Sequence, residues 1–291
     1  MLLGIDVGGT FIKYGIVEPD GTIVEQHQTP THAEEGRDAM VGRIIRIARE
    51  LSLKAPGKPI GIGVPGVVDP RSKHVQSPPN LPGWVSVPLQ QMVADATGVD
   101  VVVENDANAG AIAEARAGAG KELQDFLYVT LGTGVGGGII FNKHLHTGPH
   151  GDAGEVGHIY MQSSMSDDEP SYVLEHLIGR MGILKRYGGG SDVDVADIDT
   201  RAALGDQHAM DVMVETGKLL GIGLCGMTAV LGLRTVIIGG GISRSKIILD
   251  VARETLATRA IPTIAKNGQI LSAHFLNDAG LVGAGMLTMP A

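Results

Sequence analysis

At the start of the chain, apolar segments alternate with glycine-rich turns. The apolar run LLGID leads into the turn VGGT, and a second run, FIKYGIV, ends at a Pro-Asp-Gly turn at residues 19–21. With the segment that follows, this pattern predicts a three-stranded meander. Residues 34–54 carry apolar side chains at helical spacing, and the run IGIGV at 60–64 predicts a buried strand.

The next stretch combines a long loop with a helix and another strand. Pro, Asn and Gly crowd residues 65–83, which predicts a long loop that contains Asn80. A helix is expected around 88–97, before the apolar strand VDVVVE at 99–104. Strands that alternate with helices in this way predict an α/β sheet with parallel members.

A second unit is expected after residue 120, because FLYVTLGTGVGGGIIFNKHL repeats the opening pattern of strand, glycine turn and strand. The two glycine-rich hairpins, at 6–10 and 131–138, indicate an internally duplicated architecture in which each half offers one backbone loop to a shared ligand. Chance similarity between two glycine-rich turns is the competing interpretation. Further helices are expected at 171–187, at 208–231 and from about residue 246, with a strand at 235–240.

Composition narrows the class of protein. At 291 residues and 43% hydrophobic composition, the chain is long enough for two lobes. The formal net charge of -9 and the lack of any basic run disfavour a nucleic acid as the partner. A single cysteine, Cys225, allows no internal disulfide and no cysteine-based zinc site. With no signal-like start and no long uninterrupted apolar run, we expect a soluble cytoplasmic protein that does not contact a membrane.

The second glycine turn formally matches the dinucleotide fingerprint G-x-G-x-x-G at 132–137. That fingerprint has to open a helix, whereas residues 138–141 are β-formers, so a Rossmann oxidoreductase is disfavoured. Both hairpins instead present backbone N–H groups and a hydroxyl, from Thr10 or Thr133, to phosphate oxygens. Asp6, at the end of the first strand, is placed to orient a magnesium ion through its water shell. The alternative is that these glycines only serve turns that require positive φ.

The segment VVVENDANAG runs from an apolar strand into an alanine-rich helix, and Asp106 lies at the transition. A carboxylate there can simply cap the helix N-terminus. Together, however, Asn105, Asp106 and Asn108 form a polar cluster at the C-terminal edge of a strand, where open α/β sheets bind ligands. An aspartate so placed can accept the proton of an attacking alcohol, as kinases require.

Histidines and acids are dense between residues 144 and 158, which raises the alternative of a metal hydrolase. No H-E-x-x-H or similar helical ligand spacing is present, so we assign no metal-ligating residues there. Glu155 and His158 are instead suited to hydrogen-bonding sugar hydroxyls.

Seven motifs in this order resemble the ROK family of sugar kinases, of the glucokinase or N-acylhexosamine kinase type, over nearly the whole chain. They are GIDVGGT near the N-terminus, GVPGVVD at 63–69, NLPGW at 80–84, ENDANA at 104–109, LGTGVGGGII at 131–140, GEVGH at 154–158 and VIIGGGIS at 236–243. The resemblance implies a two-lobed, actin-like ATPase (ribonuclease H-like) α/β fold with an internal duplication. It implies a small lobe of residues 1–107 and 277–291, a larger lobe of 108–276, and an active site in the cleft between them.

The resemblance further implies ATP-dependent phosphorylation of a hexose or hexosamine, at its 6-hydroxyl, by a homodimer that uses Mg²⁺. Asp106 would be the general base. The sugar would be held by Gly66, Asn80, Asn105, Glu155, His158 and Glu175. ATP would contact Asp6, Gly8, Gly9, Thr10, Lys13, Gly132, Thr133 and Gly134 at its phosphates, and Gly239, Gly240 and Gly241 at its adenosine. Single residue identities do not specify which sugar is used.

Two departures from the family pattern stand out. Phe11 occupies the position of the usual lysine after GGT, and Lys13 follows two residues later, which leaves its phosphate role open. The segment MQSSMSDDEPSYVLE lacks the zinc-binding cysteines of many members, so no structural zinc is expected. The three adjacent acids at 167–169 are expected to form a solvated turn instead. Without zinc, we expect residues 161–170 to be mobile when no sugar is bound.

Two other functions fit parts of the pattern. Some ROK proteins are sugar-responsive transcriptional regulators with a winged helix before this domain. Here the sequence begins at the first expected strand and is acidic, which disfavours operator binding. A non-catalytic actin-like assembly protein or nucleotide-binding scaffold would need no sugar pocket, whereas the Asn105–Asp106 pair and the 155–158 loop indicate one.

Overall fold

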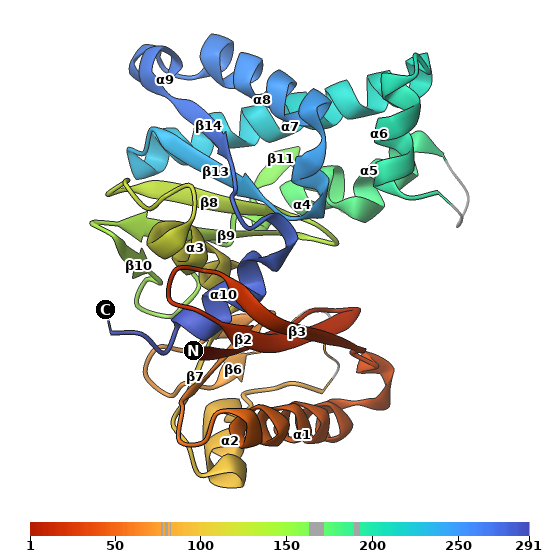
Figure 1. Ribbon diagram of the computed structural model, residues 1–291. Coiled ribbons are helices and arrows are strands. Elements are labelled where there is room, and N and C mark those ends of the chain that lie inside the picture. Colours follow the sequence, from red (N-terminus) through yellow and green to blue (C-terminus); the bar gives the residue numbers. More distant parts are fainter. Residues whose placement is uncertain (77, 79–80, 82, 163–171, 189–192, 291) are drawn as a thin grey trace. The chain divides into compact units, whose positions relative to one another are not determined.

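The chain folds into two compact units. The computed structural model describes all residues except 77, 79–80, 82, 163–171, 189–192 and 291 (Figure 1). The first unit comprises Met1–Gln124, Gly138–Gly154 and Asp278–Ala291, and the second comprises Asp125–Gly137 and Glu155–Asn277. Asn80 and the acidic run at 167–169 lie outside the described residues, as does most of the segment 161–170 that was expected to be mobile.

The first unit is built on a five-stranded sheet in the order β3-β2-β1-β4-β7. Its strands are β1 (Leu2–Val7), β2 (Phe11–Val17), β3 (Ile23–Pro30), β4 (Ile60–Val64) and β7 (Val101–Asn105). β2 pairs antiparallel with both β1 and β3, which confirms the predicted meander. β1, β4 and β7 run parallel, as the alternation of strands and helices predicted. Within the predicted long loop, β5 (Val67–Val68) and β6 (Val75–Gln76) form a small antiparallel sheet.

One face of this sheet is covered by two helices. Successive side chains of a strand point to opposite faces, so Leu3 and Ile5 of β1 share a face. Both are fully buried in the hydrophobic core that includes Ile44 of α1 (Arg37–Lys54). α2 (Leu89–Thr97) packs beside α1 and against β7. This layer of apolar side chains holds the strands that end at the candidate site.

The opposite face carries glycines, because a helix lies directly on the strand backbones. A Cβ on Gly4 would lie 2.6 Å from a carbonyl oxygen of α10 (Ala279–Met286), and one on Gly61 would lie 1.7 Å from another. Figure 1 shows this blue helix beside the red strands from the other end of the chain. α3 (Asp106–Ala117) packs on α10 in turn. The first sheet therefore depends on a segment that is distant in sequence.

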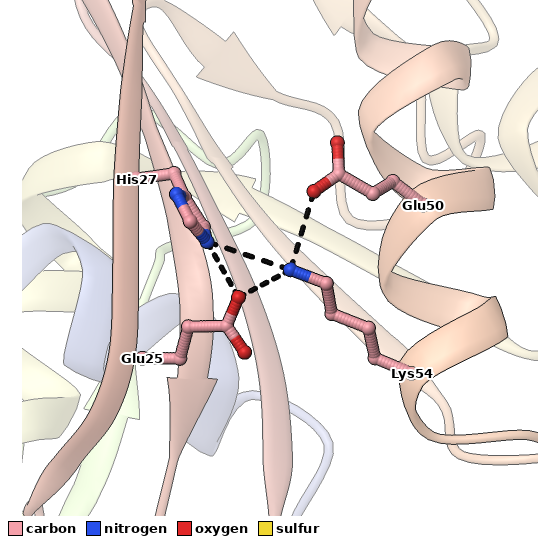
Figure 2. A network of polar contacts seen from close by, with 4 residues as sticks. All are labelled: Glu25, His27, Glu50 and Lys54. Carbon is pink, nitrogen blue, oxygen red and sulfur yellow. Dashed lines mark hydrogen bonds and ion pairs between the residues drawn. The ribbon is translucent and has the colours of Figure 1, made fainter.

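A surface network of four polar side chains links β3 to α1 (Figure 2). Lys54 Nζ lies 3.3 Å from Glu50 Oε1 and also contacts the Glu25 carboxylate. His27 Nε2 contacts the same Glu25 oxygen and lies 3.4 Å from Lys54 Nζ. The hydrogen bond between Lys54 and Glu25 lowers the pKa of Glu25 and raises the pKa of Lys54. Because the network is solvent-exposed, it contributes little to stability.

A second five-stranded sheet repeats the strand order of the first. It consists of β8 (Phe126–Leu131), β9 (Val135–Phe141), β10 (His144–His146), β13 (Thr235–Gly239) and β14 (Gln269–Ser272), arranged as β10-β9-β8-β13-β14. β9 and β10 are antiparallel, whereas β8, β13 and β14 run parallel. Numbered along the chain, both sheets have the order 3-2-1-4-5, so the predicted internal duplication is confirmed.

The helices of the second unit pack closely through glycines. α7 (Gln207–Leu231) lies against α8 (Lys246–Arg259), where a Cβ on Gly221 would be 2.5 Å from Thr255 Cβ. α6 (Val195–Ala203) also packs on α7, and α9 (Pro262–Asn267) packs on α8. Of the described helices, α7 alone is long and apolar enough to cross a membrane by length and composition. Its buried side chains, among them Met213, Leu220 and Leu224, place it as a core helix of this unit.

The structure corrects the single helix predicted at 171–187. β12 (Tyr172–Val173) and α4 (Leu174–Ile178) come first, and α5 (Arg180–Tyr187) begins only after Gly179. Gly179 has extended backbone, with φ -68° and ψ 165°, which ends one helix and starts the next. A Cβ on Gly179 would lie 3.1 Å from the carbonyl oxygen of Thr133, so the break brings α4 against the second glycine turn.

Candidate active site

The turn between β1 and β2 is held by hydrogen bonds on its inner side. Gly8 N donates to Phe11 O at 2.9 Å, and Thr31 Oγ1 donates to Gly8 O at 2.7 Å. Thr31 is fully buried, whereas Gly9 and Thr10 are exposed at the tip of the turn. Gly9 and Thr10, two of the residues predicted to face phosphates, are thus presented to solvent on a fixed base.

Neither glycine turn relies on positive φ, which corrects the alternative that these glycines only serve such backbone. Among the described residues, thirteen other glycines have positive φ, but Gly8, Gly9, Gly132 and Gly134 do not. At two of these positions, glycine is required because there is no space for a Cβ atom. A Cβ on Gly8 would lie 2.8 Å from Phe11 O, and one on Gly134 would lie 2.4 Å from a carboxylate oxygen. In both turns, the glycine backbone is therefore in close contact with neighbouring atoms that leave no space for a side chain.

Asp6 lies in a small cluster of charged side chains at the end of β1. It is directly opposite Lys13 in the β1–β2 register, and Lys13 Nζ lies 3.2 Å from Asp278 Oδ1. Gln26 Nε2 donates to the same Asp278 oxygen at 3.0 Å. A Cβ on Gly280 would lie 2.5 Å from Asp6 Oδ2, so the first turn of α10 lies against this carboxylate.

The surroundings of Asp6 favour its neutral form more than water does. Burial is the largest cause and raises the pKa of Asp6 to about 6. Lys13 opposes this shift because its positive charge favours the carboxylate, and Asp278 adds to the shift because its charge is negative. Because this pKa lies below 7, the carboxyl group is still mostly ionised at pH 7.

Asp278 and Gly280 were not singled out from the sequence. The run NDAGLVGAG is rich in small residues, which is a signal for close backbone packing. Nothing local indicates which strand that helix would contact, because its partners Asp6 and Lys13 lie at the other end of the chain.

Asp106 is the first residue of α3, and the capping role falls on its neighbour. Asn105 is the N-cap, with φ -60° and ψ 145°, and its Oδ1 accepts a hydrogen bond from Asn108 N at 3.0 Å. Asp106 Oδ1 accepts one from Ala107 N at 2.9 Å. The alternative in which Asp106 only caps the helix is therefore wrong, because Asn105 is the N-cap.

Gly63 of β4 brings the two aspartates of the first unit together. It pairs with Asp6 on one side. A Cβ on Gly63 would lie 3.8 Å from Asp6 Oδ1 and 3.5 Å from Asp106 Cα. The carboxyl ends of parallel β1, β4 and β7 meet at this edge, which is where ligands bind in open α/β sheets.

Asn105 and Gly66, both predicted to hold the sugar, are in direct contact. Asn105 Nδ2 donates to Gly66 O at 3.0 Å. Gly66 has a φ of 87°, and a Cβ there would lie 2.8 Å from Pro78 Cα, so both the turn and the available space require glycine. Asn80, the third sugar residue predicted for this region, lies outside the described residues.

Glu104 supports this group and was missed as a functional residue. Its Oε1 accepts hydrogen bonds from Asn105 N at 2.8 Å and from Asn108 Nδ2 at 3.0 Å. Burial raises the pKa of Glu104, while the hydrogen bond from Asn108 opposes the shift. Asn108 is 2% exposed. A glutamate directly after the apolar residues 101–103 of this strand is the signal that points to such a role.

In the second unit, Glu155 and His158 lie together as predicted. Glu155 precedes a short 3-10 helix, Val156–His158, and its Oε2 lies 3.3 Å from His158 Nδ1. The side chains are 42% and 63% exposed, so their polar groups are accessible to a ligand.

Glu175, at the start of α4, lies against the second glycine turn. Its Oε2 accepts a hydrogen bond from Val135 N at 2.9 Å. The turn itself is closed by Gly132 N, which donates to Gly134 O at 3.0 Å. The structure thus places a residue predicted to bind the sugar next to residues predicted to bind phosphate. The sequence did not indicate this proximity.

The glycines at 239–241 run from the end of β13 into a 3-10 helix, and Gly240 is hydrogen-bonded to Ser243 and Leu276, two residues that line a cavity. Ser243 Oγ donates to Gly240 O at 2.7 Å, which fixes the segment from the side of a 3-10 helix, Gly241–Arg244. The cavity has a volume of about 440 Å³. It is lined by Ser243, Arg244, Lys246, Leu249, Asp250, Arg253, Ser272 and Leu276. Its charged lining includes three cations and one acid, and Arg253 Nη1 lies 2.8 Å from Asp250 Oδ1.

No metal-binding cluster is found in the part of the chain that the structure describes. There, no three His, Cys, Asp or Glu side chains are grouped so as to hold an ion. Because the acids at 167–169 lie outside the described residues, the expectation of no structural zinc stays a prediction.

The sequence pattern of the ROK family matches residues 2–290. This chain belongs to the ROK family. Among its ROK relatives, the glucokinase of Thermotoga maritima is 31% identical over 302 residues, covering 97% of this chain and 95% of that protein. The N-acetylmannosamine kinase of Shigella flexneri is 28% identical over 297 residues, covering 98% of this chain and 97% of that protein.

A solved ROK structure shares the fold over its full length. The crystal structure of a ROK family glucokinase from Streptomyces griseus, in complex with glucose and AMPPNP, has a TM-score of 0.87 and 30% identity to this chain. It covers 98% of both chains. The predicted fold class, a two-lobed actin-like ATPase fold, is therefore confirmed.

Proposed function

We propose that this ROK protein is an ATP-dependent sugar kinase that transfers the γ-phosphate of ATP to the 6-hydroxyl of a hexose or hexosamine. Its relatives of nearly equal length are a glucokinase and an N-acetylmannosamine kinase. The observation that carries the mechanism is the placement of Asp106. It is the first residue of α3, next to an asparagine that already caps the helix.

Asp106 is the proposed general base. Its carboxylate is oriented by the hydrogen bond from Ala107 N and lies at the edge where three parallel strands end. As the sugar oxygen attacks the γ-phosphorus, its proton passes to the Asp106 carboxylate. The bond from the γ-phosphorus to the bridging oxygen breaks, and ADP leaves with the electron pair. The protein's main contribution is positioning, because little other covalent chemistry is required.

The sugar hydroxyls other than the attacking one are assigned to the polar side chains predicted to bind them. In the first unit, Asn105 is held rigidly by Gly66 O and Asn108 N, which leaves its amide in one orientation. In the second, Glu155 and His158 form an exposed acid and imidazole pair. A carboxylate accepts hydrogen bonds from neighbouring hydroxyls, and an imidazole can accept one or donate one. Gly66, Asn80 and Glu175 complete the proposed set.

The nucleotide is assigned to the glycine segments. The turns at 8–10 and 132–134 offer backbone N–H groups to phosphate oxygens, and residues 239–241 would lie along the adenosine. Lys13 is tied to Asp278 and lies opposite Asp6, so its charge stays close to the first turn. Bound Mg²⁺ would neutralise phosphate charge, and the mostly ionised Asp6 carboxylate fits its preference for oxygen ligands and retained waters. We further infer a cytoplasmic homodimer, which light scattering at micromolar concentration tests.

A coupled assay of ADP release tests the function directly. The full chain is incubated with ATP and Mg²⁺ and one of glucose, mannose, fructose, N-acetylmannosamine or N-acetylglucosamine. We expect sugar-dependent ADP release, with the phosphate on the 6-oxygen by ³¹P and ¹H NMR. Absence of ADP release with every sugar would contradict the proposal. Sugar binding without ADP release would instead favour a sugar-responsive regulator.

A further inference from the structure

The segment Leu174–Arg180 is hydrogen-bonded to two predicted ligand-binding regions at once. Leu174 N donates to Ile159 O at 2.8 Å, immediately after the loop of Glu155 and His158. At the other end, Arg180 N donates to Gly132 O at 3.0 Å. Between these two bonds, Glu175 Oε2 accepts the hydrogen bond from Val135 N. One short segment therefore connects the sugar loop to the glycine turn.

Glycines make this contact close enough to transmit a displacement. Glu175 Oε2 would be only 2.4 Å from a Cβ on Gly134, and Glu175 Cβ would be 3.4 Å from a Cβ on Gly157. A Cβ on Gly157 would also lie 2.2 Å from Val135 O. Glu175 is thus packed between the backbone of the turn and the backbone of the GEVGH loop. A tightly packed side chain cannot move without moving its neighbours.

We propose that Glu175 positions the glycine turn for nucleotide in addition to contacting the sugar, so that the two ligands bind cooperatively through this one side chain. The inference rests on the proposed kinase function for the identity of the ligands. It goes beyond that function because it assigns one shared residue to the two binding events and predicts positive cooperativity between them. Each ligand then strengthens the binding of the other.

The physical basis is the two oxygens of one carboxylate. Oε2 is engaged by Val135 N, in a charge-assisted bond that is stronger than one between neutral groups. Among the described residues, no hydrogen bond to Oε1 is found. A sugar hydroxyl that donates to Oε1 fixes the carboxylate in one rotamer. The same restriction fixes the turn at 132–135, so a nucleotide that binds afterwards loses less conformational entropy.

A purely structural role for the Glu175–Val135 bond is the competing explanation. In that case the bond would only hold α4 in place, and removing it would lower stability without affecting nucleotide affinity in the folded protein. Two substitutions separate these cases. Glu175→Gln keeps an oxygen that can accept from Val135 N, whereas Glu175→Ala removes it. Glu254→Gln, at an exposed position of α8 that has no proposed role in binding, serves as the control.

The experiment measures Mg·ADP affinity by calorimetry on the full chain, with and without the sugar found by the ADP-release screen. Without sugar, we expect Glu175→Ala to bind ADP about tenfold more weakly than wild type, and Glu175→Gln and Glu254→Gln to bind within about twofold. With sugar, the wild type should bind ADP several-fold more tightly, and Glu175→Ala should lose this gain. Wild-type ADP affinity in folded Glu175→Ala without sugar would overturn the proposal.

A second measurement needs no substitution and covers the case in which Glu175→Ala does not fold. Hydrogen exchange of the wild-type peptide that contains Val135 should slow when the sugar is added without nucleotide, and should not change with a sugar that is not a substrate. Unchanged exchange with the substrate sugar would overturn the proposal. Failure of the kinase function has a different signature, namely no ADP release with any sugar, and it leaves the sugar-free ADP comparison valid.

Discussion

Asp6 and Lys13 face each other across the β1–β2 ladder, at the position where the two strands approach their turn. The family pattern places a lysine directly after GGT, where this chain has Phe11, 44% exposed. Directly opposed residues of an antiparallel pair point to the same face of the sheet, so Lys13 lies on the same face as Asp6, and Asp278 holds its ammonium there. A positive charge is thus kept beside the first glycine turn from a different position in the strand.

Asp106→Asn is expected to abolish turnover while leaving the sugar site intact. The amide keeps the shape and the bond to Ala107 N, but it cannot accept the proton of the sugar hydroxyl. We expect kcat to fall by about 10²- to 10⁴-fold, with sugar affinity within about tenfold of wild type. Steady-state kinetics and calorimetry measure the two effects. The matched control is Asp95→Asn, an exposed residue of α2, which should leave both unchanged. A folded Asp106→Asn variant with more than about a tenth of wild-type activity would exclude Asp106 as the base.

Asp6→Asn should change how stability depends on pH. The folded pKa of Asp6 is about 6 and its ordinary value is 3.8, so the folded state binds a proton more readily than the unfolded state. Stability from this group therefore rises as the pH falls through 6, and is lost as the pH rises. Relative to Asp6→Asn, the wild type should gain on the order of 2 kcal/mol between pH 7 and pH 4. Urea unfolding at several pH values measures the difference, with exposed Asp38→Asn as control. Parallel stability curves for wild type and Asp6→Asn would contradict the prediction.

Glu104→Ala should weaken both the fold and the sugar site. It would leave Asn105 N and Asn108 Nδ2 without their acceptor in a region where Asn108 is buried. The loss of stability should be about 2 kcal/mol, because unsatisfied buried polar groups are costly. Glu104→Gln retains an acceptor oxygen and should recover most of the stability. We also expect the KM for sugar to rise more than the KM for ATP in Glu104→Ala. Equal changes in both KM values would argue that Glu104 only supports the fold.

The purified enzyme should contain no structural zinc. A stable site needs about four ligands in tetrahedral arrangement, and the family's cysteines are missing from the segment before Glu175. Elemental analysis of chelator-treated protein, together with activity before and after treatment, checks this. One tightly held zinc per chain, with activity lost on removal, would show that acids and histidine have replaced the cysteines.

Sequence patterns predicted the parts of this structure that depend on local order. The similarity of the two glycine-rich hairpins predicted an internal duplication, which appears as the shared strand order of the two sheets. The strand-to-helix transition at Asp106 predicted the start of α3. What they could not supply were contacts between distant segments. The pairing of Lys13 with Asp278 spans almost the whole chain, and no local signal encodes it.

The break at Gly179 was missed for a related reason. Apolar side chains continue at helical spacing from α4 into α5, so periodicity alone predicts one helix. Gly179 caps α4 and also lies against Thr133 O, a contact between distant segments that periodicity does not encode. The same holds for Glu175, whose bond to Val135 N joins residues that are 40 positions apart.

The location of α10 also sets the order in which the protein can fold during synthesis. The strands β1, β4 and β7 leave the ribosome early, but the helix that covers one face of their sheet is made only after the second unit. Until then, Gly4 and Gly61 leave a stretch of bare strand backbone exposed. Arg116 Nη1 donates to Met286 O at 2.9 Å, so this hydrogen bond also forms only after α10 has been made. The nascent first unit must therefore persist as an incomplete intermediate, with one face open to chaperones or to misassembly, until translation of the second is finished.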